Sequence, residues 1–192
     1  MRSRPTDMST ATGLLTLGLV LVGCATFSTD PRIRGRVTMQ TDEVIEQQIR
    51  TSIRRWDSAF EDAHLVVVSY NGVVLLAGQV ATPSMKDKAA ELAARVEKVR
   101  SIHNELEVGE PTSVWVRTND AAITTKIKTR LLAGDQTYSR SVKVVTENST
   151  VYLMGMIPRE EADRTISLVS RVSGVKKIVK VFEYIDLADA VI

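Results

Sequence analysis

An internal duplication constrains the fold of this chain more than any other feature. The segment "VVVSYNGVVLLAGQV" at residues 66–80 matches "VKVVTENSTVYLMGMI" at residues 142–157. The flanking segments match in the same order, 42–53 with 120–131 and 94–108 with 170–184. Corresponding positions lie 76 to 78 residues apart. A period of that length is typical of two small tandem domains, and it excludes a solenoid of short repeats.

The opening segment of each copy predicts an amphipathic helix. Ile45, Ile49 and Ile53 recur every four residues, which places them on one helix face. The second copy repeats this spacing with Ile123, Ile127 and Leu131. Each copy therefore begins with a helix that has one apolar stripe.

Two short strands are expected after each opening helix. Asn71-Gly72 is a strong hairpin-turn signal between the first pair of strands, and Asn148-Ser149 is a weaker one in the second copy. A second helix is expected near Pro83 and near Pro158, with Thr82 as an N-cap in the first copy, and a final strand follows. The order helix, strand, strand, helix, strand predicts an α+β fold. Each domain should have a three-stranded mixed sheet with two helices on one face.

The amino terminus predicts export and lipid attachment. Residues 13–22 are apolar and uncharged and follow Arg2 and Arg4. This run is too short to span a bilayer, which needs about 20 residues, and it is typical of a secretory signal. It ends at Leu21-Val22-Gly23-Cys24, which resembles the bacterial lipobox, and Cys24 is the only cysteine. We therefore expect acylation at Cys24. An uncleaved signal or a chance apolar segment are the alternatives.

These patterns divide the chain into six parts. The expected parts are a signal peptide (1–23), a lipidated tether (24–41), a first domain (42–108), a linker (109–117), a second domain (118–186) and a tail (187–192).

The repeated unit resembles the BON domain. The residues that carry this resemblance are "VYLMG" at 151–155 and "SRVSGVKKI" at 170–178, and the first copy keeps "VVLLAG" at 73–78. The full layout of lipobox, tether and two domains resembles the family of division- and outer-membrane-stress-associated lipid-binding lipoproteins. That resemblance implies an outer-membrane lipoprotein that faces the periplasm and supports envelope integrity, with a possible enrichment at division sites. Ala25 after the cysteine also favours the outer membrane.

Charge differs between the two copies, although the whole chain carries a net charge of only +2. Residues 42–108 have a net charge of −3 and residues 118–186 have a net charge of +3. The second domain is therefore the better candidate for contact with an anionic surface. Lys126 and Arg130 lie one helical turn apart, and an ordinary solvated helix face is the alternative interpretation.

By resemblance, the second domain binds anionic phospholipid through its opening helix. Relatives have an aromatic residue at the start of this helix, where the present chain has Ala122. We hypothesise that Trp115 inserts in place of the missing ring. The alternative is that Trp115 packs between the domains. The expected lipid-binding residues are Trp115, Ala122, Ile123, Lys126, Lys128, Arg130, Lys176 and Lys177.

The sequence offers no pattern for catalysis, for a metal site or for a cofactor. His64 and His103 have no further metal-ligand residue at a suitable spacing, and a lone cysteine cannot form a disulfide within the chain. Nucleotide-binding glycine motifs and a nucleophile elbow are absent. The basic residues lack interleaved aromatics, which argues against nucleic-acid binding. We expect a non-enzymatic lipoprotein with an anionic phospholipid membrane as its partner. An adaptor for an envelope protein, with incidental lipid contact, is the alternative.

Overall fold

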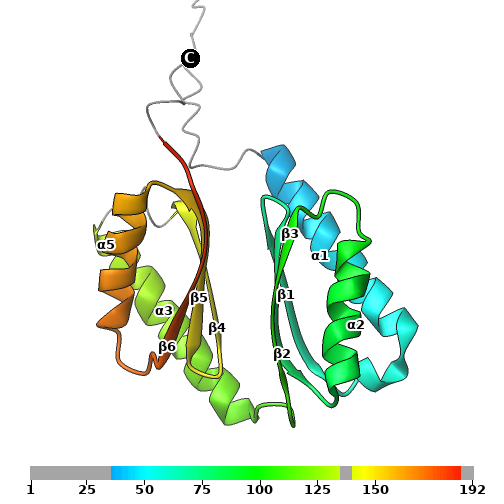
Figure 1. The fold of residues 1–192 in the computed structure, drawn as a ribbon. Coiled ribbons are helices and arrows are strands. Elements are labelled where there is room, and N and C mark those ends of the chain that lie inside the picture. Colours follow the sequence, from blue (N-terminus) through cyan, green and yellow to red (C-terminus); the bar gives the residue numbers. More distant parts are fainter. Residues whose placement is uncertain (1–35, 135–139, 187–192) are drawn as a thin grey trace, which may run out of the picture.

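A computed structural model describes residues 36–134 and 140–186 (Figure 1). The expected signal peptide, Cys24, residues 24–35 of the expected tether and the tail at 187–192 lie outside the described residues.

The two domains have the same order of elements. The first domain consists of α1 (Arg36–Trp56), the short 3-10 helix η1 (Ser58–Phe60), β1 (His64–Tyr70), β2 (Val73–Val80), α2 (Pro83–Ala94) and β3 (Ser101–Val108). The second consists of α3 (Val114–Gly134), β4 (Val142–Glu147), β5 (Thr150–Ile157), α5 (Arg159–Ser170) and β6 (Lys177–Tyr184). The expected order of helix, strand, strand, helix, strand is confirmed in both copies.

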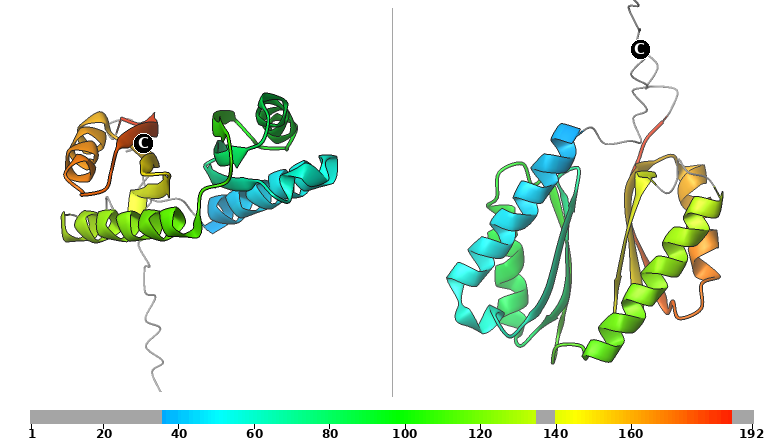
Figure 2. Two further views of the ribbon diagram at one scale, coloured as in Figure 1. Left: turned by 90° about the horizontal axis from the view of Figure 1, so that it is seen from below. Right: turned by 180° about the vertical axis from the view of Figure 1, so that it is seen from behind.

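Each domain contains one three-stranded mixed sheet. In the first sheet β1 pairs antiparallel with β2, and β2 pairs parallel with β3. The second sheet has the same arrangement in β4, β5 and β6. The two helices of each domain lie on the same side of its sheet (Figures 1 and 2). The predicted α+β fold is therefore correct.

The hairpin turns show why the weaker turn signal still forms the same turn. Asn71 and Gly72 have φ values of 53° and 74°, and Asn148 and Ser149 have φ values of 48° and 64°. Two consecutive positive φ angles are required by the hairpin turn whose twist suits the adjoining strands. Ser149 adopts the left-handed conformation that glycine accepts without steric cost in the first domain.

Two helices begin earlier than the sequence predicted. α1 begins at Arg36, within the stretch 24–41 assigned to the tether, and α3 begins at Val114, within the linker 109–117. The apolar residues of these helices that reach the core begin only at Ile45 and Ile123. The turns before them cover no core, so they carry no apolar period from which a helix could be recognised.

The two sheets pack against each other through the faces that their own helices leave uncovered. One apolar cluster joins the domains; its buried members are Val68, Tyr70, Val73, Leu75, Ala77, Tyr152, Met154 and Val181. We call this contact the seam. The molecule therefore has four layers, with two sheets inside and a pair of helices on each outer side (Figure 2).

Polar contacts flank the apolar centre of the seam. The Tyr70 hydroxyl donates to the carbonyl oxygen of Ser141 at 2.9 Å. The Nε2 atom of His64 lies 3.0 Å from the Oε2 atom of Glu147. The first pair joins the end of β1 to the residue before β4, and the second joins the start of β1 to the end of β4. The two edge strands therefore run in opposite directions across the seam.

A buried carboxylate holds one end of the seam. Glu147 is only 5% exposed, and it accepts hydrogen bonds from Gln79 at 3.2 Å and Thr112 at 3.4 Å in addition to its contact with His64.

Burial, followed by the negative charges of Glu105, Glu107 and Glu147, raises the pKa of Tyr152 to about 12. Tyr152 therefore stays protonated and uncharged at neutral pH.

Candidate functional site

The opening helix of the second domain, α3, presents one face to the core and the opposite face to solvent. Ile123, Ile127 and Leu131 are buried at successive turns. The helix is capped by Ser113, whose hydroxyl accepts from the backbone amide of Val116 at 3.4 Å. The core-facing stripe fixes the rotation of the helix, and it thereby determines which side chains face outward.

A buried aspartate ties α3 to the β4–β5 turn. Asp120 is 4% exposed and accepts hydrogen bonds from the backbone amides of Asn148 at 2.8 Å and Ser149 at 2.9 Å. In the first domain Asp42 accepts in the same way from Asn71 and Gly72, at 2.8 and 2.9 Å. These bonds place the start of each opening helix over its hairpin turn.

The role of Asp42 and Asp120 was not predicted from the sequence, where they only begin the matching segments 42–53 and 120–131. A signal was present, because an aspartate occupies the same place three residues before the first core isoleucine in each copy. That position faces the core, where a carboxylate is expected only if hydrogen bonds satisfy it.

The exposed face of α3 is cationic and begins with a tryptophan. Trp115 is 84% exposed and Val114 is 68% exposed. Trp115 does not pack between the domains, so the structure removes that alternative. Trp115 and Ala122 are seven residues apart, so they lie on the same side of the helix. Lys126 and Arg130 are exposed on this same side, whereas Arg117 and Lys128 are exposed on the opposite flank of the helix, toward β4.

No acidic side chain is exposed on α3. Its one acidic residue is Asp120, which is buried and bonded to the turn. The cations on the exposed side therefore have no counter-charge on their own helix. An anionic surface that approaches α3 would meet only positive charge there.

The structure corrects one expected lipid-binding residue. Ile123 is 0% exposed and belongs to the core of the second domain. Its Cδ1 atom lies so near Gly174 that a Cβ atom added to this glycine would come within 2.9 Å. The prediction that Ile123 contributes to an exposed lipid contact is wrong, because it confused the core-facing stripe with the outer face next to it.

The other expected residues are spread along the length of α3. Lys176 and Lys177 are exposed, and the backbone amide of Lys176 donates to Ser149 at 2.9 Å. That bond places the two lysines beside the turn that Asp120 holds, at the end of the domain where α3 begins. Trp115 is at the same end. Lys126 lies in the middle of the helix, and Lys128 and Arg130 lie toward its carboxyl end.

Residues 36–134 and 140–186 lack two features, a cluster of metal ligands and a membrane-spanning helix. No three His, Cys, Asp or Glu side chains in this part of the chain are gathered so that they could hold a metal ion. Among the helices described, none combines the length and apolar character that crossing a bilayer requires.

Comparison with known proteins identifies the repeated unit. A family model described as the BON domain matches residues 41–110 and 119–186. The chain is 40% identical over 156 residues to "21 kDa hemolysin" of Actinobacillus pleuropneumoniae, covering 81% of this chain and 79% of that protein. It is 36% identical over 162 residues to "Outer membrane lipoprotein DolP" of Haemophilus influenzae, covering 84% and 83%. It is 31% identical over 140 residues to "Osmotically-inducible protein Y" of Escherichia coli, covering 71% and 69%.

Solved structures add nothing to this. CdsD, a structural protein of the type III secretion system of Chlamydia trachomatis, aligns with a TM-score of 0.33 at 11% identity, covering 74% of this chain and 95% of that one. A structural similarity this weak supports no conclusion about the present protein. The two segments matched by the family model cover most of the chain, and the relatives match across both. The protein therefore belongs to the BON-domain family and resembles the outer membrane lipoprotein DolP along most of its length.

Proposed function

We propose that this protein is a non-enzymatic, lipid-anchored component of the outer membrane whose second domain rests on anionic phospholipid through the exposed face of α3. The observation that carries this proposal is the composition of that face. It joins an 84% exposed Trp115 to Lys126 and Arg130 on the same side of the helix, with Arg117 and Lys128 exposed on the opposite flank and no exposed acid on the helix. Tryptophan is enriched at the headgroup level of membranes, and each cation near an anionic surface contributes about 1 kcal/mol.

Acylation of Cys24 would keep the protein at the membrane. Two or more acyl chains anchor a protein stably, whereas a single chain binds only marginally. Because the acyl anchor would hold the protein at the membrane, the contact made by α3 would only have to orient the two domains on the bilayer. The name of the DolP relative supports the outer membrane as the location. Support of envelope integrity, with enrichment at division sites, is part of the same proposal.

Vesicle flotation tests the lipid contact. The fragment should be residues 25–192, because a fragment that began at residue 42 would remove residues 36–41 from the start of α1. We expect this fragment to float with vesicles rich in phosphatidylglycerol and to stay behind with pure phosphatidylcholine. Binding should fall as salt rises from 50 to 300 mM, because salt screens exposed charges. No binding to any vesicle, together with a specific envelope protein recovered by pull-down, would favour the adaptor alternative.

Trp115 provides the sharper measurement. The chain has two tryptophans, so a Trp56→Phe variant reports Trp115 alone. Its emission should shift to the blue on addition of anionic vesicles. Trp115→Ala should weaken binding about tenfold, because burying roughly 60 Å² of apolar ring surface is worth about 1.5 kcal/mol. Val108→Ala, at another exposed apolar residue, is the matched control and should bind as the wild type does. Equal binding by Trp115→Ala would remove this residue from the proposed contact.

Mass spectrometry of the native protein tests the anchor separately. The expected mature species begins at Cys24 and carries acyl chains. Cys24→Ala should release the protein from the membrane fraction. A native protein with an intact leader and an unmodified thiol would contradict the anchor while leaving the lipid contact of α3 open to its own test.

A further inference from the structure

At one end of the molecule the two domains reach solvent on either side of residues 109–113, which connect β3 to α3. β3 ends there and α3 and β6 begin there, whereas α1 begins at the opposite end (Figure 1). A small cavity of about 100 Å³ at this end is lined by residues from 59–63 and from 109–111. The turn before β1 therefore lies against the connection. We call this surface the link end.

The first-domain half of the link end is acidic. Asp62 and Glu110 line the same small cavity. The end of α1 adds Arg54, Arg55 and Asp57 at the outer corner of the domain, away from the connection (Figure 1). The exposed carboxylates nearest to the connection are Glu61, Asp62, Glu107 and Glu110. The surface beside the connection is therefore negative in this domain.

The second-domain half of the link end is basic. Arg117 is exposed near the start of α3. Three further cations lie around the start of β6, where the backbone amide of Lys176 bonds to the β4–β5 turn. They are Arg171, Lys176 and Lys177, and all three are exposed. The two halves of the link end therefore carry opposite charge.

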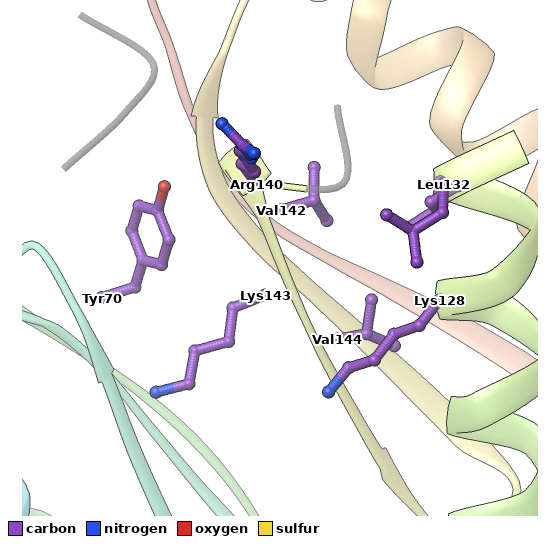
Figure 3. A pocket seen from close by; sticks show the side chains of 8 residues that line it. Tyr70, Lys128, Leu132, Arg140, Val142, Lys143 and Val144 are labelled. Atoms are coloured by element: carbon purple, nitrogen blue, oxygen red, sulfur yellow. The ribbon is translucent and has the colours of Figure 1, made fainter. Parts of the chain in front are cut away.

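The other exposed charges on the flanks of the second domain lie away from the link end. Among the described residues, Glu160 and Asp163 are in the first turns of α5, which begins at the opposite end of the molecule (Figure 1). Lys128 and Arg140 lie near the carboxyl-terminal half of α3 and the start of β4 (Figure 3). No exposed acid of the described part of this domain is therefore close to Arg117, Lys176 and Lys177.

The centre of the link end is apolar. Val108, at the end of β3, is 50% exposed, and Val114, at the start of α3, is 68% exposed. They stand at the two ends of the connection, and Pro111 within it is also exposed. An apolar centre with a charged rim is the usual composition of a protein interface.

The charge pattern indicates what kind of partner fits this surface. The four acids beside the connection and the four cations form no ion pair with any residue of 36–134 and 140–186. The acidic half would repel an anionic bilayer, and the basic half would repel a basic protein. A fitting partner must be positive opposite the first domain and negative opposite the second. A second copy of this chain, turned by 180°, meets this requirement because its halves exchange places.

We propose that two copies associate through their link ends as a two-fold symmetric dimer. The acidic half of each copy faces the basic half of the other, and Val108 and Val114 of both copies lie near the axis. This assigns a protein contact to Lys176 and Lys177, for which the sequence predicted a lipid contact. The inference goes beyond the proposed function and does not depend on it.

The dimer is compatible with contact between α3 and a bilayer. α1 and α3 lie on the same side of the molecule (Figure 2). If the two-fold axis runs along the line of sight of Figure 1, the rotation leaves these helices of both copies on one side of the dimer. Lys126 and Arg130, farther along α3, stay outside the interface. Both copies can therefore face one membrane.

Analytical ultracentrifugation of residues 25–192, without lipid, measures the association. We expect a reversible equilibrium between one chain and two chains. Raising the salt from about 50 to about 300 mM should weaken it about tenfold, because salt screens exposed charges. A single-chain mass even at about 1 mM protein, where very weak contacts are populated, would overturn the proposal. Assemblies larger than two chains would also overturn it, because a head-to-tail contact forms open chains.

Charge reversal identifies the two surfaces. Glu61→Lys with Asp62→Lys makes the acidic half positive, and Lys176→Glu with Lys177→Glu makes the basic half negative. Each double variant alone should associate at least about tenfold more weakly than the wild type, because like charges then face each other. An equal mixture of the two should associate as well as the wild type, since opposite charges face each other at both contacts of the mixed dimer. A mixture that stays as weak as the separate variants would overturn the proposal.

Two control variants reverse the same numbers of charges elsewhere on the second domain. Glu160→Lys with Asp163→Lys matches the acidic pair, and Lys128→Glu with Arg140→Glu matches the basic pair. Each control should change association less than about twofold, because these positions lie away from the link end. Losses as large as those of the link-end variants would show that net charge alone decides association, and the proposal would fall. The vesicle flotation result is measured separately, so failure of the dimer leaves the proposed function standing.

Discussion

The opening helices α1 and α3 are built on the same buried plan and differ on their outer faces. Both carry an aspartate bonded to the hairpin turn and an apolar residue at every fourth position of the core stripe. Their outward positions differ: Gln48, Arg50 and Ser52 on α1 correspond to Lys126, Lys128 and Arg130 on α3. The comparison teaches that the buried half of the helix preserves the domain, while the exposed half is free to acquire a different chemistry in each copy.

Arg50 shows that even the shared cation is used differently. It donates to Glu46 at 3.0 Å and to the carbonyl oxygen of Val67. Both bonds of this arginine are therefore made within its own domain. Lys128, at the equivalent place on α3, has no such bond within the described residues and stays available for a ligand.

The largest expected effect compares two equivalent glycines. A Cβ atom at Gly78 would overlap the carbonyl oxygen of His64, and Gly78 also has a φ of +107°. A Cβ atom at Gly155 would lie 2.5 Å from the Ser141 oxygen, without a left-handed φ. Gly78→Ala should cost at least about 4 kcal/mol in the free energy of unfolding and Gly155→Ala about 2 kcal/mol. Urea unfolding measures both, and equal losses would show that neither the closer overlap nor the left-handed φ of Gly78 adds to the cost.

The next effect concerns the two aspartates. Asp42→Ala and Asp120→Ala should each lower the free energy of unfolding by about 3 kcal/mol, because one buried and one part-buried backbone amide of the turn lose a charged acceptor. Asp42→Ala should cost more, since Asp42 also accepts from the Ser69 hydroxyl at 2.6 Å. Glu43→Ala and Asn119→Ala, at exposed neighbouring positions, serve as controls in thermal unfolding. If the controls lose as much stability as the aspartate variants, the bonds to the turns are not the cause.

Exchanging the outer charges sharpens the comparison in lipid binding. Lys126→Gln with Arg130→Ser gives α3 the outer residues of α1, and it should weaken binding to anionic vesicles about thirtyfold at low salt, since two charges contribute about 2 kcal/mol. The reverse exchange, Gln48→Lys with Ser52→Arg, should not restore binding when added to that variant, because Trp115 lies on α3. Full restoration in flotation assays would mean that total charge decides binding, and that the position of α3 does not.

The smallest effect concerns the two turns. Ser149→Gly should stabilise the protein by about 0.5–1 kcal/mol, because glycine accepts the φ of 64° at this position without steric cost. Gly72→Ser should destabilise it by more than that, because a Cβ atom at Gly72 would also meet the Lys98 carbonyl oxygen at 2.6 Å. Calorimetry resolves both shifts. A loss of stability in Ser149→Gly would show that the serine side chain contributes more than its backbone strain costs.

The sequence predicted the parts of the fold that repeat locally. Ile45, Ile49 and Ile53 face the core as their spacing indicated, and Asn71-Gly72 forms the expected turn. Thr82 caps α2 by accepting from the Met85 amide at 3.2 Å. Each of these depends on residues near one another in the chain, so a short window of sequence contains the whole signal.

The seam was not predicted, because it joins residues that are far apart in the chain. One clue was present in β2, where all eight residues of "VVLLAGQV" are buried. A strand with one solvated face alternates between apolar and polar residues, and a continuous apolar run indicates that both faces are covered. The run indicated a second layer over the sheet, but it did not identify the other domain as that layer.

The charge of the second domain was predicted from its sequence, and the placement of the candidate site only in part. The structure leaves Trp115, Lys126 and Arg130 exposed on one side of α3 and Lys128 exposed on the opposite flank. Ile123 was assigned wrongly because spacing shows which residues share a face and leaves open whether that face is inside or outside.

The short connection between β3 and α3 has a thermodynamic consequence for the seam. Only residues 109–113 separate these two elements, so neither domain can move far from the other. Such a link holds the two sheet faces at an effective concentration in the millimolar range. Even a weak affinity between them then keeps them closed at any cellular abundance of the protein. A protease cut within this link would make the pairing of the two halves depend on dilution.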